Sequence, residues 1–168
     1  MNSNFLTHTI RLTLLLLAQV LVFSHIHLFG YVTPLVIGYV MVCFRQGSSR
    51  VELLLWGFVT GLLFDMTNNT AGMASTACTL VAMVQPAVLN AFTPHDTSDG
   101  FMPSLRVLGA QNYLLYVLFL MFILHGVFYL LDAFTLANWP LTMLSIAGST
   151  LLATVLCFFI ELMVHPKR

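Results

Sequence analysis

The side chains best suited to chemistry in this chain are a few carboxylates and histidines set into long apolar blocks. Asp65 ends the helical part of the stretch GFVTGLLFDMTNNTAG, where it follows Gly57 and Gly61 at steps of four. Steps of four place all three residues near one face of a helix. The carboxylate either caps the turn into the next helix or contacts a partner, and the sequence leaves both roles open.

Histidines and aspartates towards one predicted side of the membrane invite a metal-site or proton-relay interpretation. These residues are His25, His27, His125, Asp65 and Asp132. His25 and His27 are two residues apart and point to different faces of a helix, and no HExxH or His-x3-His pattern is present. We therefore expect no metal and no cofactor, and we interpret His125 as a hydrogen-bonded packing residue.

Catalytic patterns are missing from the sequence. Ser149 follows Gly148, but there is no GxSxG motif and no pair of carboxylates deep in an apolar block. Glu161 lies one turn before His165, and we interpret it as part of an interfacial cluster that reaches towards water. The sequence predicts a protein that is not an enzyme, with an intramembrane hydrolase as the weakest alternative.

The composition is that of an integral membrane protein. Of the 168 residues, 59% are hydrophobic and only 7% are charged, against roughly 25% in an ordinary soluble domain. The formal net charge is zero, which argues against nucleic acid as a partner because phosphate binding needs a clustered excess of Lys and Arg. Cys43, Cys78 and Cys157 lie in different apolar blocks and are interpreted as core residues.

Six apolar blocks predict one all-α transmembrane domain covering residues 1–168. Lipid leaves no water to satisfy backbone groups, and the continuous blocks lack the alternation of barrel strands, so each block is predicted to be a helix. The predicted spans are residues 10–27, 31–44, 51–65, 71–88, 107–131 and 140–164.

Charge placement agrees with six spans. With that count, one side of the membrane receives every basic residue, namely Arg11, Arg45, Arg50, Arg106, Lys167 and Arg168. Cytoplasmic loops are enriched in Lys and Arg, so both termini are predicted to be cytoplasmic. The fourth block adds a stripe of small residues that includes Ser75, which is typical of a helix-packing face, and its Gln85-Pro86 pair predicts a kink or an irregular turn.

The order of these features resembles the rod shape-determining protein MreD family. The resemblance is carried by FGYVTPLV at the second span, GFVTGLLFDM in the third, the turn TNNTAG, and a fourth span rich in Ala, Ser and Thr. Its most specific part is the Gly57, Gly61 and Asp65 series followed by Gly72. The stretch NSNFLTHTIRLTLLLLAQVLVFSHIHLFGY also looks like the amino-terminal block of one subgroup.

The resemblance implies a non-enzymatic, multi-pass component of the bacterial cytoplasmic membrane. Its implied partner is the bitopic periplasmic protein MreC, and through it the filament MreB, the polymerase RodA and a penicillin-binding transpeptidase, which together direct peptidoglycan synthesis and cell shape. A homodimer is a further alternative. The family fold is similar to the substrate-capturing subunits of energy-coupling-factor vitamin transporters, so transport is the rival function.

The groove that would receive the MreC-like partner is predicted at the third and fourth spans. Helices in lipid associate through close packing of small residues and through interhelical hydrogen bonds. We therefore expect Gly57, Gly61, Asp65, Gly72 and Ser75 to form a helix-contact or partner-binding face.

Overall fold

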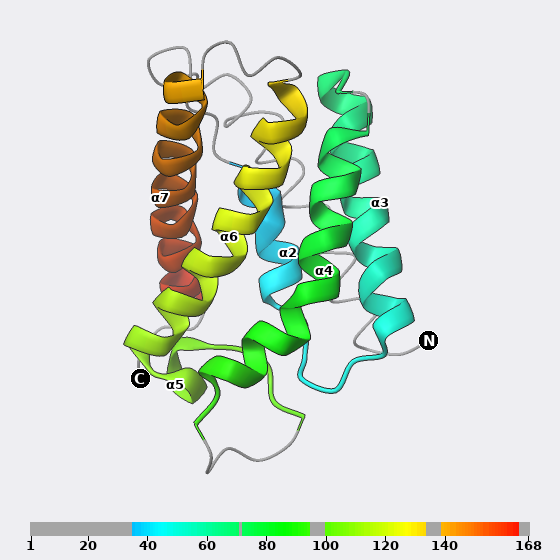
Figure 1. The fold of residues 1–168 in the computed structure, drawn as a ribbon. Helices are drawn as coiled ribbons and strands as arrows, with labels where there is room; N and C mark the ends of the chain where they lie inside the picture. The colour runs from blue at the N-terminus through cyan, green and yellow to red at the C-terminus, as the bar shows by residue number, and fades with distance from the viewer. Residues whose placement is uncertain (1–34, 71, 95–99, 134–138, 165–168) are drawn as a thin grey trace.

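The computed structural model describes residues 35–70, 72–94, 100–133 and 139–164, and every element in these ranges is helical. Four long helices run side by side and alternate in direction along the chain (Figure 1). They are α3 (Arg50–Asn68), α4 (Met73–Phe92), α6 (Ala110–Asp132) and α7 (Trp139–Val164). The all-α prediction is confirmed for these residues.

Four of the predicted spans fall on these helices. Spans 51–65, 71–88, 107–131 and 140–164 correspond to α3, α4, α6 and α7. Within the described ranges, α4, α6 and α7 are long and apolar enough to cross a membrane, so the chain is a membrane protein. The predicted span 10–27 lies outside the described residues, and the total of six spans and the side of the termini stay predictions.

The second predicted span, 31–44, differs from expectation in its described part. It forms a short 3₁₀ helix, η2 (Val36–Gly38), which continues into a single α-helical turn, α2 (Tyr39–Val42). The hydrophobic side chains of residues 35–44 are at most 5% exposed. α2 packs against α3 and α4, and η2 packs against α7. We call residues 35–44 the central segment.

Two helix boundaries also differ from the prediction. The span expected to begin at Val107 is interrupted, because α5 (Leu105–Leu108) ends at Gly109 and α6 starts only at Ala110. Gly109 has φ +78°, a left-handed conformation that glycine adopts at little cost. α4 runs one turn beyond the expected end, passes through Pro86, and bends in its lower half (Figure 1).

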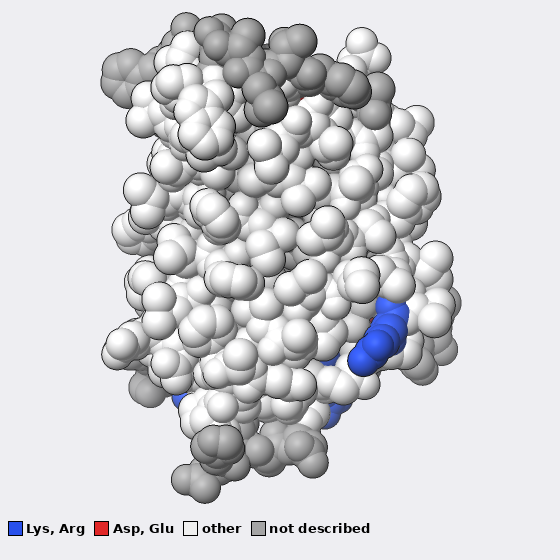
Figure 2. Space-filling view, viewed as in Figure 1, with Lys and Arg blue, Asp and Glu red and all other residues white. Residues whose placement is uncertain are grey.

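The outer surface of the described residues is largely apolar, and their Lys and Arg side chains are confined to one end. α3 presents a stripe of exposed apolar side chains at steps of three and four: Val51, Leu55, Phe58, Leu62 and Met66. Figure 2 shows basic side chains only near the lower end of the visible face. All Lys and Arg of the described ranges, namely Arg45, Arg50 and Arg106, lie where α3 and α6 begin. We call this the basic end; Asn69, Gly72 and Asp132 mark the opposite end.

Candidate functional site

The carboxylate of Asp65 binds the first turn of the following helix. Its Oδ1 accepts the backbone N–H of Ala74 at 3.0 Å and the hydroxyl of Thr70 at 2.5 Å. Its Oδ2 accepts both the backbone N–H and the hydroxyl of Ser75, at 2.9 and 2.5 Å. Asp65 is only 6% exposed. Both carboxylate oxygens are therefore engaged within this chain.

The turn between α3 and α4 explains why this cap comes from the preceding helix. α3 is followed by its C-cap residue Asn69, whose backbone is left-handed (φ 55°), and the N–H groups of Asn69 and Thr70 both donate to the carbonyl of Asp65. Gly72, with φ +79°, precedes α4, and no side chain at that N-cap position can accept from the first turn. The first N–H groups of a helix need acceptors and favour a negative charge. The Asp65 carboxylate supplies the acceptors and the negative charge.

The two glycines of the motif allow α3 and α4 to touch. A Cβ on Gly61 would lie 2.4 Å from the Cα of Ser75 and 2.5 Å from the carbonyl oxygen of Ala74. A Cβ on Gly57 would lie 2.8 Å from the Cβ of Ala82. Real Cβ atoms essentially never come within 3.0 Å of a non-bonded heavy atom, so only glycine permits this approach of the two helices.

Gly57, Gly61, Asp65, Gly72 and Ser75 thus act together as a helix-hairpin lock. The glycines set the separation of α3 and α4, and the carboxylate fixes their ends. The sequence left the role of Asp65 open between capping and partner contact, and its hydrogen bonds are those of a cap. Because α4 covers the glycine face, that face is an internal contact, and a partner would have to bind elsewhere on the molecule.

A second polar group secures the central segment to α4 and α6. Gln85 Nε2 donates to the hydroxyl of Tyr116 at 2.9 Å and to the carbonyl of Phe44 at 3.4 Å. The Tyr116 hydroxyl donates in turn to the carbonyl of Val42 at 3.2 Å. A helix as short as α2 leaves its last carbonyls without helical partners, and lipid supplies none. The side chains of Gln85 and Tyr116 supply the hydrogen-bond donors that these carbonyls lack.

His125 serves the beginning of the same segment. Its Nε2 lies 3.1 Å from the backbone N–H of Leu35, and its Nδ1 lies 2.8 Å from the carbonyl of Met121. A neutral imidazole satisfies both contacts, accepting at Nε2 and donating at Nδ1. The ring is fully buried and stacks on Tyr129. The predicted role of His125 as a hydrogen-bonded packing residue is confirmed.

Glu161 departs from the sequence interpretation. It was expected in an interfacial cluster reaching towards water, but it is only 1% exposed and accepts a 2.6 Å hydrogen bond from the Tyr39 hydroxyl. The interfacial interpretation is therefore wrong for Glu161, because the side chain turns into the helix bundle towards the central segment. His165 and Lys167, its predicted neighbours, lie outside the described residues.

The remaining candidate catalytic and metal-binding residues of the described ranges do not form a common site. The Ser149 hydroxyl lies 2.9 Å from the hydroxyl of Tyr129, while Asp132 is exposed at the opposite end. Within the described ranges, no three side chains among His, Cys, Asp and Glu come together to hold a metal. His25 and His27 lie outside those ranges. The residues that the sequence interpretation missed are Tyr39 and Tyr116, whose signal was a hydroxyl in an otherwise apolar block.

Comparisons with known proteins found no match. No protein-family model matches the sequence, no curated protein matches it, and no solved structure matches the fold.

Proposed function

We propose that this protein is a non-enzymatic, multi-pass component of the bacterial cell-elongation complex in the cytoplasmic membrane. In this proposal it holds an MreC-like bitopic periplasmic protein and is linked through it to MreB, RodA and a penicillin-binding transpeptidase. The resemblance of Gly57–Gly72 to the MreD motif suggests the class. The structure supports it by giving each motif residue a role in a rigid helical hairpin, as a scaffold requires.

The observation that carries the proposal is the internal use of the polar groups. A substrate-capturing transporter subunit needs convergent polar groups facing a cavity. The sequence offers Asp65, Asn68, Asn69, His125 and Asp132 for that task, and of these Asp65 and His125 are buried. Asp65 uses both oxygens on Thr70, Ala74 and Ser75, and both nitrogens of His125 are engaged. Groups already paired and buried stabilise a fold, which favours the scaffold over the vitamin-transporter alternative.

In this proposal the close contact of α3 and α4 at Gly57 and Gly61 has a bracing role, which is to fix the position of α3 for a partner. Since α4 covers Gly57 and Gly61, the membrane span of a partner would pack on an exposed apolar face, and the locked hairpin would hold that face in shape. The stripe of α3 from Val51 to Met66 is one such face. Helix association in lipid depends on close packing, so a displaced α3 would weaken it.

Affinity purification of the tagged full-length protein from bacterial membranes tests the proposal. We expect the wild type and Gly126→Leu to co-purify a bitopic periplasmic protein, since a Cβ at Gly126 would meet nothing within 4 Å. Gly61→Leu is expected to insert at equal levels but to lose the co-purified periplasmic protein. Unchanged association of Gly61→Leu would refute the bracing role. A small molecule bound stoichiometrically to the wild type, without such a partner, would refute the scaffold function.

The proposed orientation is tested separately by cysteine labelling. Arg50→Cys at the basic end should react with a membrane-impermeant maleimide only after the cells are permeabilised, whereas Asn69→Cys at the opposite end should react in intact spheroplasts. Both positions are exposed. The native cysteines of the described part are buried and give little background. The reverse labelling pattern would place the basic end outside and contradict the cytoplasmic assignment.

A further inference from the structure

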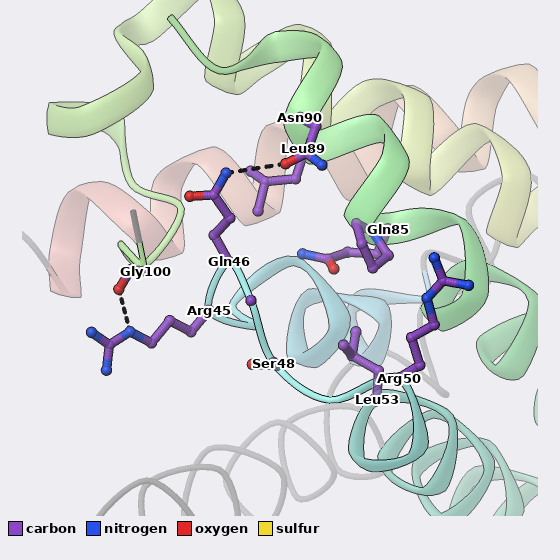
Figure 3. A pocket seen from close by; sticks show the side chains of 11 residues that line it. Arg45, Gln46, Ser48, Arg50, Leu53, Gln85, Leu89, Asn90 and Gly100 are labelled. Atoms are coloured by element: carbon purple, nitrogen blue, oxygen red, sulfur yellow. Dashed lines mark hydrogen bonds between the residues drawn. The ribbon is translucent and has the colours of Figure 1, made fainter. Parts of the chain in front are cut away.

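A cavity of about 350 Å³ opens at the basic end of the molecule. It lies between the loop that joins the central segment to α3, the first turn of α3, and the lower part of α4 (Figure 3). Its size is at the lower end of the range for small-molecule sites, roughly 300–1,000 Å³. The cavity is large enough for a polar headgroup but not for a whole lipid.

Among the residues that the structure describes, the charge of the lining is entirely positive. Arg45 and Arg50 line the cavity, and the described lining residues include no Asp or Glu. Arg45 Nε donates to the carbonyl of Gly100, which holds the side chain at one side of the site (Figure 3). Arg50 is exposed, and no described residue forms an ion pair or hydrogen bond with its guanidinium. Glu52, two residues after Arg50, lies outside the lining.

The lining also contains three amide side chains, those of Gln46, Gln85 and Asn90, which are held in place by hydrogen bonds. Gln46 Nε2 donates to Asn90 Oδ1 at 3.1 Å, which joins the loop to α4. Gln85 is 1% exposed and is anchored on Tyr116 and the carbonyl of Phe44. Figure 3 shows the Gln85 amide reaching from α4 towards the loop. Arg45 and Arg50 lie on opposite sides of the site (Figure 3). The site is therefore preorganised, with arginine at its edge and fixed polar groups inside.

We propose that this cavity binds the phosphate group of an anionic phospholipid headgroup, with Arg50 as the principal contact. A guanidinium matches phosphate oxygens in two parallel hydrogen bonds, and basic pockets between helices at the cytoplasmic surface suit anionic lipid headgroups. A lipid is favoured over a soluble phosphate by what adjoins the site. Val51 and Leu55, 67% and 59% exposed, continue from Arg50 along the outside of α3 and offer an apolar track for acyl chains.

The test measures lipid-dependent melting of the purified full-length protein in detergent. Phosphatidylglycerol is expected to raise the melting temperature more than phosphatidylcholine does. Arg50→Gln should weaken the apparent affinity for phosphatidylglycerol about tenfold, the effect of losing one arginine–phosphate contact. Arg106→Gln is the matched control, because it removes the same charge at the same end from a residue outside the lining.

A second variant and a soluble probe complete the design. Arg45→Gln should also weaken the response to phosphatidylglycerol, so the test does not depend on Arg50 alone. Equal losses in Arg50→Gln and Arg106→Gln would indicate diffuse attraction and overturn the site, as would equal responses to the two lipids. If sn-glycerol 3-phosphate or inorganic phosphate gives the same Arg50-dependent shift at the same concentration, the lipid assignment is overturned in favour of a soluble phosphate.

Discussion

Replacement of Asp65 should unlock the α3–α4 hairpin without preventing membrane insertion. Asp65→Asn preserves the size of the side chain but turns one acceptor oxygen into a donor. Either the N–H of Ala74 and the hydroxyl of Thr70, or the N–H and hydroxyl of Ser75, then lose their acceptor. Asp65→Ala removes the acceptor from both backbone N–H groups at once. The two substitutions therefore form a graded series on the same contact.

The expected magnitudes follow from those lost contacts. Removing an N-cap costs about 0.5–2 kcal/mol, and a buried donor left without an acceptor costs about 1–3 kcal/mol. Hydrogen bonds measured within membrane proteins lie lower, at about 0.6 kcal/mol on average, and the polar turn before α4 is predicted to lie at the membrane surface. We therefore expect a loss in the free energy of unfolding of about 1–2 kcal/mol for Asp65→Asn and about 2–4 kcal/mol for Asp65→Ala.

The assay is equilibrium unfolding in mixed micelles, with helicity followed by circular dichroism. Asp132→Asn is the matched control, because it is an exposed carboxylate at the same end and should change stability by no more than about 0.5 kcal/mol. If Asp65→Asn and Asp65→Ala both unfold with the free energy of Asp132→Asn, the carboxylate does not hold the hairpin and the lock is refuted.

Two further pairs of variants test contacts by the same assay. Gly61→Ala places a methyl 2.4–2.6 Å from the α4 backbone and should destabilise by about 1–3 kcal/mol, whereas Gly126→Ala has open space and should gain about 0.5–1 kcal/mol; equal effects would contradict the close contact. Tyr39→Phe removes a donor from the buried carboxylate of Glu161 and should cost about 1–3 kcal/mol. Tyr113→Phe removes a buried hydroxyl without a hydrogen-bond partner in the described structure and should be neutral or stabilising; a larger loss for Tyr113→Phe would reverse this reasoning.

The long helices were predictable because lipid restricts the choice of structure. An apolar block in a bilayer has to satisfy its own backbone, so block boundaries locate helices such as α3 and α7 within a few residues. Helical phase also placed Gly57, Gly61 and Asp65 near one face. The identity of the opposing atoms was not predictable, because the N–H groups of α4 that Asp65 binds are present in any sequence and carry no signal of their own.

The central segment was the larger departure, and its reason is non-local. Residues 31–44 were expected to span the membrane as one helix, but the described helix covers only Val36–Val42. What makes so short a helix tolerable is a set of polar side chains far away in sequence: Gln85, Tyr116, His125 and Glu161. Each could be noticed alone as a polar residue in an apolar block. Nothing in their spacing shows that all four bind the central segment.

The enclosed central segment has a consequence for how the chain is made. It leaves the ribosome before α3, α4, α6 and α7, yet its hydrogen-bond partners lie on the last three of these helices. A nascent chain ending after α4 has Gln85 to bind Phe44 but lacks the tyrosine for Val42, and the acceptor of Tyr39 is synthesised only near the end of α7. Assembly of the interior therefore finishes only after synthesis of α7 is nearly complete, and chains truncated before Glu161 should be substrates for membrane quality control rather than partly working proteins.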